Sequence, residues 1–440
     1  MALLRRLDLR KATGEDELAS QLPAPELVGE GPVDAVRQII SAVREGGDRA
    51  LRELSARFDG VEPACLRVPA EEIAAAQSAV SRELWAALGR AARAIRQFHE
   101  AELAAHHGFE ATSPEGIVTR EILLPVGRAG CYVPGGKAPL ASSLLMTAIP
   151  AQVAGVREVA VCSPPLADGH VAVAVLAAAA AAGTEEVYAI GGAQAVAAMA
   201  YGTETVRPVD VIVGPGNLYV ATAQRLLAET GLVGVPSAFA GPSEVVVVAD
   251  ETTVVEQAAL DLVVQAEHGP NGLAWLVTWH EPVAEAVEAA VDRLATQSRR
   301  SEEVVATLRK GGWSVLVKGP EEAMVVCNVV APEHLELMTA DPEVLVPLVR
   351  SAGAVFCGPW SPASIGDYVA GPSHVLPTAR SARYASALGA SDFMKRVHVV
   401  TASEEALRRV APDVASLARA EGLDAHAESV LVRSGGSLSL

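Results

Sequence analysis

The chain has 440 residues and a formal net charge of −18, and half of its residues are hydrophobic. This length is too great for one small core, so two or more domains are expected. Because the acidic balance comes without any basic block, nucleic acid and anionic membranes are poor partners, and a small molecule is the better candidate. Alanine and valine dominate and aromatic residues are few, which favours an α/β enzyme over an all-β module.

The cysteines are scattered, odd in number and never paired as CxxC, so the sequence predicts neither a disulfide framework nor a thiolate zinc site. They are Cys65, Cys131, Cys162, Cys327 and Cys357. The N-terminus, MALLRRLDLRKATGEDE, mixes both charge signs and does not resemble a signal peptide. We therefore expect a cytoplasmic protein without a membrane span.

The first quarter of the chain is expected to be mainly helical. Residues up to about 30 form a polar lead-in, and helical periodicity follows from Val33 to Glu45, with a break at Gly46-Gly47. A long amphipathic helix is predicted from Ser81 to Ala105. The block from Gly116 to Leu124 then has the pattern of a strand.

The middle of the chain changes to repeated βα units. Each opens with a short strand-like run and a Gly or Pro turn, and a helical stretch follows: EVAVCSPP, EEVYAIGGAQAVAAMA and VDVIVGPGNLYVATAQRLL. Such units build a parallel sheet whose ligand-binding loops gather at its carboxyl edge. The apolar stretch from Val171 to Ala182 is too short to span a membrane, which needs ~20 residues, and predicts a buried helix.

A second α/β stretch begins with a strand from Glu244 to Ala249 and includes WSVLVKG and GAVFCGPW. The last segment, from about Gly389, is expected to be mainly helical and to end in SGGSLSL.

Two glycine loops lie between a predicted strand and a predicted helix, at Gly191-Gly192 and at Gly214-Pro215-Gly216-Asn217. Backbone N–H groups at a helix start can hold a phosphate. Neither loop is GxGxxG, and each taken alone fits an ordinary tight turn. Together with Tyr132-Val133-Pro134-Gly135-Gly136, they favour a nucleotide bound in an atypical way.

Four distant segments each place a histidine near a carboxylate or an amide inside an otherwise apolar stretch, which a bare core would not require. The pairs are Gln265 and His268, Glu333 and His334, Asp367 and His374, and Glu421 and His426.

Gln265 and His268 are the most metal-like pair, because a helix running on from Val255 would carry both on one face. The alternative is a histidine at a helix end beside an exposed amide.

The other segments are weaker individually. Asp367 follows a glycine in an expected loop, where turn chemistry is common. Glu333 and His334 could serve as a base and a water-positioning group, or both could be surface residues. Glu421 and His426 have the weakest spacing. Combined, two imidazoles, a carboxylate and an amide oxygen suit zinc in an open catalytic site.

The chain resembles the histidinol dehydrogenase family, the NAD-dependent enzymes that complete histidine biosynthesis. The resemblance extends from the lead-in to about Arg433 and is densest in CYVPGGKAPLASSLLMTAIPAQVAGV, IGGAQAVAAMAYGTETV, VDVIVGPGN, AGPSEVVVVAD, DLVVQAEH, APEHLEL and SPASIGDYVAGPSHVLPT.

The resemblance implies a role for each matching residue. One zinc ion per site would be bound by Gln265, His268, Asp367 and His426. Glu333 and His334 would be the acid/base residues. Substrate contacts would come from Ser243, Gln265, His268, His334, Asp367, His374, Glu421 and His426, and NAD contacts from Tyr132, Gln194 and Asn217.

The resemblance also implies two Rossmann-like parallel-sheet domains with small N-terminal and C-terminal helical extensions, in a swapped homodimer. The expected parts are an N-terminal extension (1–30), a first α/β domain (31–133 plus 245–388), a second α/β domain with the NAD-binding loops (134–244), and a C-terminal segment (389–440). That last segment would carry Glu421 and His426 into the partner's active site.

The implied reaction oxidises L-histidinol through L-histidinal to L-histidine, with His334 taking the alcohol proton and Glu333 activating water. A second hypothesis is a related zinc- and NAD-dependent dehydrogenase that acts on another polar alcohol, and the presence of Ser243, His374 and Glu421 argues against it. A third is a metal- or nucleotide-binding scaffold, which the Glu333-His334 pair argues against.

The chain departs from the usual family pattern at Gly269, Ala363, Ser373 and near Val235-Pro236-Ser237. None of these positions is a proposed ligand, but residues behind the ligands orient them, so specificity could differ. Cys131, beside the expected cofactor tyrosine, is interpreted as a packing residue.

Overall fold

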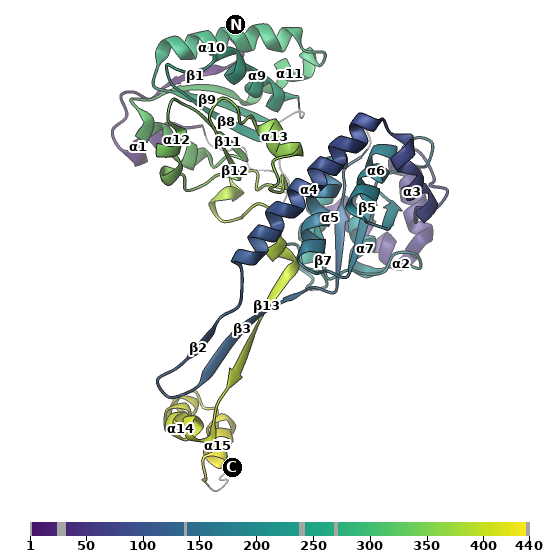
Figure 1. Cartoon of the computed structure of the whole chain (residues 1–440), viewed down its shortest axis with the longest axis vertical. Helices are drawn as coiled ribbons and strands as arrows, with labels where there is room; N and C mark the ends of the chain where they lie inside the picture. Colours follow the sequence, from purple (N-terminus) through teal and green to yellow (C-terminus); the bar gives the residue numbers. More distant parts are fainter. Residues whose placement is uncertain (1, 24–31, 136–138, 237–242, 268–271, 437–440) are drawn as a thin grey trace. The chain divides into compact units, whose positions relative to one another are not determined.

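The computed structural model describes residues 2–23, 32–135, 139–236, 243–267 and 272–436 (Figure 1). The chain divides into two compact units. The first contains Met1–Glu100 and Gly127–Phe393, and the second contains Ala101–Val126 and Met394–Leu440. The expected mixed α/β class is confirmed, because the first unit holds two parallel sheets with helices packed around them.

One sheet of the first unit has six strands, and all its neighbouring strands pair in parallel. In spatial order they are β1 (Arg5–Asp8), β10 (Gly312–Leu316), β9 (Leu273–Thr278), β8 (Glu244–Ala249), β11 (His334–Met338) and β12 (Ala354–Cys357). The predicted strand from Glu244 to Ala249 is confirmed as β8. Every residue of β8 is buried, as expected for a central strand that helices cover on both faces.

Helices cover both faces of this sheet. Successive side chains of β8 point to opposite faces and pack against the helices on each side. Val245 and Val247 pack in one cluster with α9 (Val255–Ala266), α10 (Glu281–Gln297) and α11 (Ser301–Gly311). Val246 and Val248 pack in the other with α1 (Glu15–Gln21) and α12 (Pro320–Val330).

The second sheet of this unit has four parallel strands in the order β6 (Glu186–Ala189), β5 (Glu158–Ser163), β4 (Arg128–Tyr132) and β7 (Val211–Val213). The three predicted βα units are confirmed, with helices α6 (Val173–Ala182), α7 (Gly192–Tyr201) and α8 (Leu218–Ala228). The expected alanine-rich buried helix is α6.

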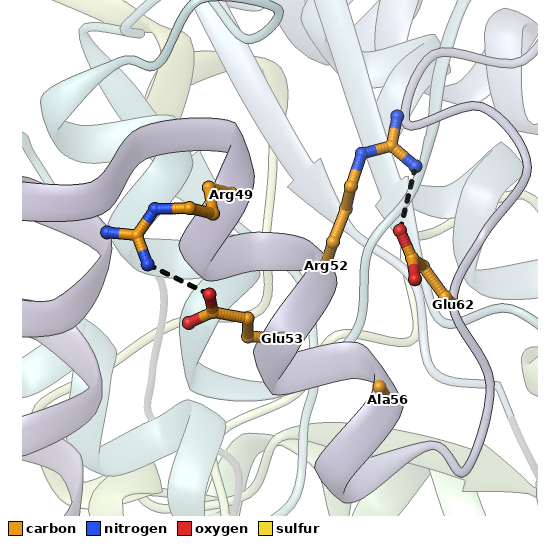
Figure 2. A pocket seen from close by; sticks show the side chains of 5 residues that line it. All are labelled: Arg49, Arg52, Glu53, Ala56 and Glu62. Carbon is orange, nitrogen blue, oxygen red and sulfur yellow. Dashed lines mark hydrogen bonds and ion pairs between the residues drawn. The ribbon is translucent and has the colours of Figure 1, made fainter.

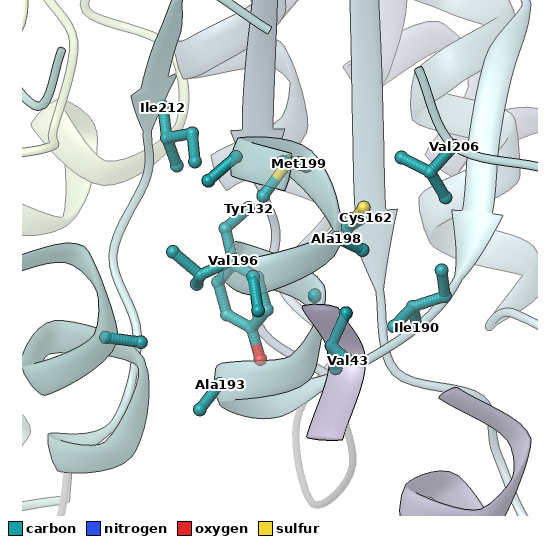
Figure 3. Close-up of a cluster of buried hydrophobic side chains, with 14 of the residues drawn as sticks. Val43, Tyr132, Cys162, Ile190, Ala193, Val196, Ala198, Met199, Val206 and Ile212 are labelled. Atoms are coloured by element: carbon teal, nitrogen blue, oxygen red, sulfur yellow. The ribbon is translucent and has the colours of Figure 1, made fainter. Parts of the chain in front are cut away.

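The core of the four-stranded sheet includes residues from far upstream. Side chains of α2 (Val33–Phe58), α7 and α8 gather on it, and Figure 3 shows Val43, Tyr132 and Met199 in this cluster. The predicted break in α2 is present, since Gly47 has φ 53° and ψ −137° inside the helix. Helices α3 (Ala70–Ala79) and α5 (Ala141–Val153) both pack against α6.

Two features differ from the expected domain membership. The expected first domain includes 31–133, but α2 packs in the core of the four-stranded sheet and β4 hydrogen-bonds within that sheet. The lead-in is also more than a polar extension, because β1 adds a parallel edge strand beside β10, where the Arg5 guanidinium lies 3.8 Å from the centre of the Trp313 ring. The other boundaries stay a prediction.

The second unit contains an antiparallel sheet in the order β13 (Met394–Thr401), β3 (Val118–Pro125) and β2 (Glu110–Thr112), followed by α14 (Glu404–Ala420) and α15 (Asp424–Arg433) (Figure 1). The strand predicted near residues 116–124 is confirmed as β3. The mainly helical expectation for the C-terminal segment missed β13, which pairs with β3 over its whole length.

The remaining elements are α4 (Arg82–Ala105), which confirms the predicted long helix, α13 (Ala363–Tyr368), and the 3-10 helices η1 (Pro342–Val344), η2 (Val346–Leu348), η3 (Ser381–Arg383) and η4 (Ala390–Phe393). Across the described ranges, no helix is both long enough and apolar enough to cross a membrane.

Gly214, directly after β7, lies where the loop packs closely against the end of β4. It has φ +111°, and an added Cβ would lie 2.1 Å from the carbonyl oxygen of Tyr132. Gly214→Ala should therefore lower the free energy of unfolding by about 3 kcal/mol or more, measured by urea denaturation. The control is Gly183→Ala, at φ +70° with open space around it, which should cost only about 1 kcal/mol. Equal losses of unfolding free energy in the two variants would contradict the close approach of Gly214 to the Tyr132 carbonyl.

Candidate active site

Glu333 and His334 lie at the start of β11, next to the start of β8. His334 pairs in register with Val245, which brings Glu244 alongside Glu333. Glu333 is 8% exposed and His334 is 3% exposed. The alternative that both are surface residues is therefore wrong, and the pair lies at the amino edge of the six-stranded sheet.

The backbone of Glu244 holds both side chains. Its N–H donates to Glu333 Oε2 over 3.1 Å, and its carbonyl oxygen lies 3.2 Å from His334 Nδ1. Because a carbonyl can only accept, Nδ1 carries the proton, and Nε2 of the neutral ring is left as a base. Nε2 lies 3.9 Å from Asp367 Oδ1, so these two groups face the same space.

Asp367 lies in the short helix α13, so the expectation of a loop there is wrong. Gly366 allows α13 to approach β12, because an added Cβ would lie 2.7 Å from the Phe356 ring. The N–H of Ala363, at the start of α13, donates to Glu336 Oε1 over 2.8 Å. These two contacts fix the helix that presents Asp367 to His334.

His374 joins the same group of side chains. Its Nδ1 lies 2.7 Å from the carbonyl oxygen of Asp367, and its Nε2 lies 3.3 Å from Ser143 Oγ in α5. The neighbouring Ser373 Oγ donates to the carbonyl oxygen of Met146 over 2.9 Å. Ser373 thus ties this loop to α5.

Gln265 lies in the last turn of α9 and is 3% exposed. Its Nε2 is buried and has no hydrogen-bond partner among the atoms described. Ser243 immediately precedes β8 and is half-buried. His268, together with the departure at Gly269, lies outside the described residues, as does Ser237. Within the described ranges, no three His, Cys, Asp or Glu side chains are grouped to hold a metal ion.

Glu421 and His426 belong to the second unit. Glu421 ends α14, and His426 lies in the first turn of α15. Both are exposed, so neither side chain is committed to a core.

Sequence reasoning missed two buried carboxyl groups, Glu244 and Glu336, and the half-buried Asp261 beside Glu336. Glu244 is 2% exposed, and burial followed by the charge of Glu333 raises its pKa to about 8. Burial and the charge of Asp261 raise the pKa of Glu336, and burial likewise raises the pKa of Asp261. The available signal was a carboxylate inside an apolar strand, in EVVVVA and in HLELM.

The three expected cofactor residues lie at the carboxyl edge of the four-stranded sheet, where its strands end. Tyr132 ends β4 and is 4% exposed, and its hydroxyl accepts from the Gly192 N–H over 3.1 Å. Gln194, in the first turn of α7, is 1% exposed, and its Nε2 is a second buried donor with no partner in the described structure. Asn217 caps α8, and its Oδ1 accepts from the N–H groups of Tyr219 and Val220.

A surface groove on α2 is not a competing site (Figure 2). Arg49 lies 2.8 Å from Glu53, and Arg52 lies 3.7 Å from Glu62. The positive charges of the groove are already paired, and none of the expected site residues lines it.

Known proteins match almost the entire chain. The family model described as histidinol dehydrogenase matches residues 27–434. The histidinol dehydrogenase of Rhizobium meliloti (strain 1021) is 46% identical over 97% of this chain and 98% of its own length. That of Methanothermobacter thermautotrophicus is 44% identical over 90% of this chain and 91% of its own.

A solved structure of histidinol dehydrogenase from Elizabethkingia anophelis is 33% identical and superimposes with a TM-score of 0.92, covering 98% of both chains. Sequence and fold therefore agree with this family over almost the whole chain. The chain belongs to the histidinol dehydrogenase family of oxidoreductases, as its motifs predicted.

Proposed function

We propose that this chain oxidises L-histidinol through L-histidinal to L-histidine, the last step of histidine biosynthesis, with zinc and two molecules of NAD per substrate. The observation that carries the proposal is the buried Glu333-His334 pair facing Asp367, in a member of this family. The alternative, oxidation of another polar alcohol, is less well supported because the residues expected to contact this substrate, Ser243, His374 and Glu421, are all present.

Zinc would be held by Gln265, His268, Asp367 and His426. The residues that the structure describes fit this role. Gln265 offers a buried amide whose nitrogen is not held by a hydrogen bond, so its oxygen is able to turn toward a metal, and Asp367 offers a carboxylate that is partly open to solvent. Oxygen and imidazole donors without thiolate suit zinc. When bound, the metal supplies a template that orients the imidazole and the amine of the substrate.

His334 is arranged to move the first proton. Its Nδ1 is held by the Glu244 carbonyl, so Nε2 takes the proton of the alcohol as the carbon loses its hydride. That proton then returns to the aldehyde oxygen when water adds. Glu333 takes the proton that this water loses. As the hydrate gives up the second hydride to NAD, His334 Nε2, which is free again, takes the proton of a hydrate hydroxyl, and the carboxylic acid remains. Burial of both residues keeps bulk water away from the aldehyde.

Ser243, His374 and Glu421 would complete the substrate contacts, and Tyr132, Gln194 and Asn217 would contact NAD. Tyr132 and the buried, unpartnered amide of Gln194 meet at a strand edge lined by close-packed glycines, which fits a dinucleotide that approaches the backbone. The NAD-binding part would be 134–244, extended by β4 and α2.

We also propose a homodimer in which the C-terminal segment completes the partner's site with Glu421 and His426. The second unit exposes large apolar side chains, among them Val400 at 66% and Leu417 at 67%, while its buried helix cluster consists of Ala415, Ala418 and Ala427. Exposed apolar surface of this kind favours a partner that covers it.

We propose that the protein works in the cytoplasm. The five free cysteines are consistent with a reducing compartment.

The metal proposal predicts that a chelator abolishes turnover and that zinc restores it. Gln265→Ala should bind less than about a tenth of the parent's zinc, measured by elemental analysis, because a first-coordination donor is lost. Gln194→Ala is the matched amide control, which should weaken NAD binding and keep the zinc content. Activity indifferent to chelation, or full zinc in Gln265→Ala, would contradict the assigned ligands.

The acid/base roles predict different defects in the two oxidations. His334→Asn should slow alcohol oxidation by about 10²–10⁴-fold, and Glu333→Gln should slow aldehyde oxidation by a similar factor. Single-turnover formation of reduced NAD from histidinol and from histidinal measures each step. The surface variants His170→Asn and Glu321→Gln should match the parent. Equal slowing of both steps in both variants would refute the division of labour.

Shared sites predict complementation between inactive chains. His426→Ala and Gln265→Ala damage different halves of the proposed site, so mixing them under conditions of subunit exchange should create some intact sites. We expect up to about a quarter of parental activity for random pairing into dimers with shared sites. Chain exchange shown by mass spectrometry without any regained activity would mean that all ligands come from one chain.

A further inference from the structure

Glu244 occupies the point where the two acid/base residues are held. It is the first residue of β8 and is almost completely buried. Its N–H and carbonyl contact Glu333 and His334, as described above. Its own carboxyl accepts from the Ala379 N–H at Oε1 over 3.1 Å, while Oε2 is shielded from solvent and has no hydrogen-bond partner in the described structure.

The charges around this carboxyl oppose its ionisation. Burial is the largest effect, and the carboxylate of Glu333 adds repulsion, which together raise the pKa of Glu244 to about 8. The N–H groups that reach it and the guanidinium of Arg380 act in the other direction but are weaker. His334, the first residue of β11 and the neighbour of Glu333, contacts the carbonyl oxygen of Glu244 through Nδ1. A carboxyl held this way keeps its proton at neutral pH.

The backbone is strained at residues on both sides of Glu244 and Glu333. In the described chain, the non-glycine residues with positive φ are Ala331 at 49°, Ala379 at 52° and Arg380 at 63°. Ala331 precedes Pro332 and Glu333, and Ala379 donates its N–H to Glu244. Such conformations are unfavourable for residues with a side chain and persist where the surrounding structure enforces them. Strain on both sides of Glu244 and Glu333 indicates a site in which side-chain placement matters.

We propose that Glu244 is a positioning residue whose neutral carboxyl leaves Glu333 as the ionised member of the pair and holds it in place to accept the proton of water. When two carboxyl groups are buried side by side, ionising one of them costs less free energy than ionising both. With the proton on Glu244, the charge belongs to Glu333, where the aldehyde step requires a base. The catalytic part of this inference depends on the proposed function, whereas the protonation of Glu244 does not.

The protonation is tested by infrared spectroscopy and by stability, with Glu244→Gln as the neutral isostere. The control is Glu321→Gln, at an exposed position of α12. The parent should show protonated-carboxyl C=O absorption at neutral pH, and Glu244→Gln should lack the part of it that comes from Glu244. The pKa of Glu336 is also raised, so absorption from Glu336 should remain in both proteins. The native state keeps a proton that the unfolded chain loses above its ordinary pKa of 4.5. The parent therefore loses stability as pH rises from about 4.5 to about 8, and the melting temperature of Glu244→Gln should exceed that of the parent by a margin that widens over this window.

The positioning role is tested by kinetics on the zinc-loaded protein. Near pH 7, Glu244→Gln should oxidise histidinal at least about tenfold faster than Glu244→Ala, because the amide keeps a neutral group of the same shape beside Glu333. Glu244→Gln as slow as Glu244→Ala would mean that the negative charge is needed, and would overturn the proposal. An unchanged infrared band in Glu244→Gln would overturn it as well.

These measurements separate the two ideas. A parent that fails to oxidise histidinol but shows the Glu244 band would refute the proposed function alone. If Glu244→Ala does not fold, the infrared band and the pH-dependent melting of Glu244→Gln still decide whether Glu244 is neutral.

Discussion

The parallel pairing of β8 with β11 is the constraint on which the candidate site depends. With His334 in register with Val245, one residue of β8 can hold a carboxylate through its N–H and an imidazole through its carbonyl. A shift of one residue would turn these side chains to the other face of the sheet. Gly353 supports the same register, because an added Cβ would lie 2.6 Å from the carbonyl oxygen of Glu333.

The two halves of the proposed chemistry use opposite ends of parallel strands. Tyr132, Gln194 and Asn217 lie where strands of the four-stranded sheet end, which is the usual ligand edge of such sheets. Glu333 and His334 lie where strands of the six-stranded sheet begin. The carboxyl-edge rule thus applies to the expected cofactor loops, while the acid/base pair depends on strand starts, where a first residue can use both its backbone and its side chain.

Elements with strong local patterns were predictable from the sequence. The βα units and β8 combine apolar runs with glycine turns, so periodicity and turn chemistry agree. The strand β13 was missed because MKRVHVVT carries three basic or imidazole side chains and is largely exposed, so it forms only through pairing with β3. The helical setting of Asp367 was missed because it depends on the contact of Gly366 with Phe356, between residues that no local pattern connects. The role of Glu244 depends on register between strands, which the sequence does not specify directly.

The second unit has a thin interior. Its helices bury five alanines, of which Ala415, Ala418 and Ala427 form one cluster, and its sheet has three strands. Alanine side chains gain little from burial, so the opening of α14 and α15 is expected to cost much less free energy than global unfolding. Amide hydrogen exchange should then be fastest in these helices, and proteases should cut there first. Glu421 and His426 thus belong to the least protected part of the chain. Proteolytic cleavage in this unit would remove them while the two parallel sheets stay folded.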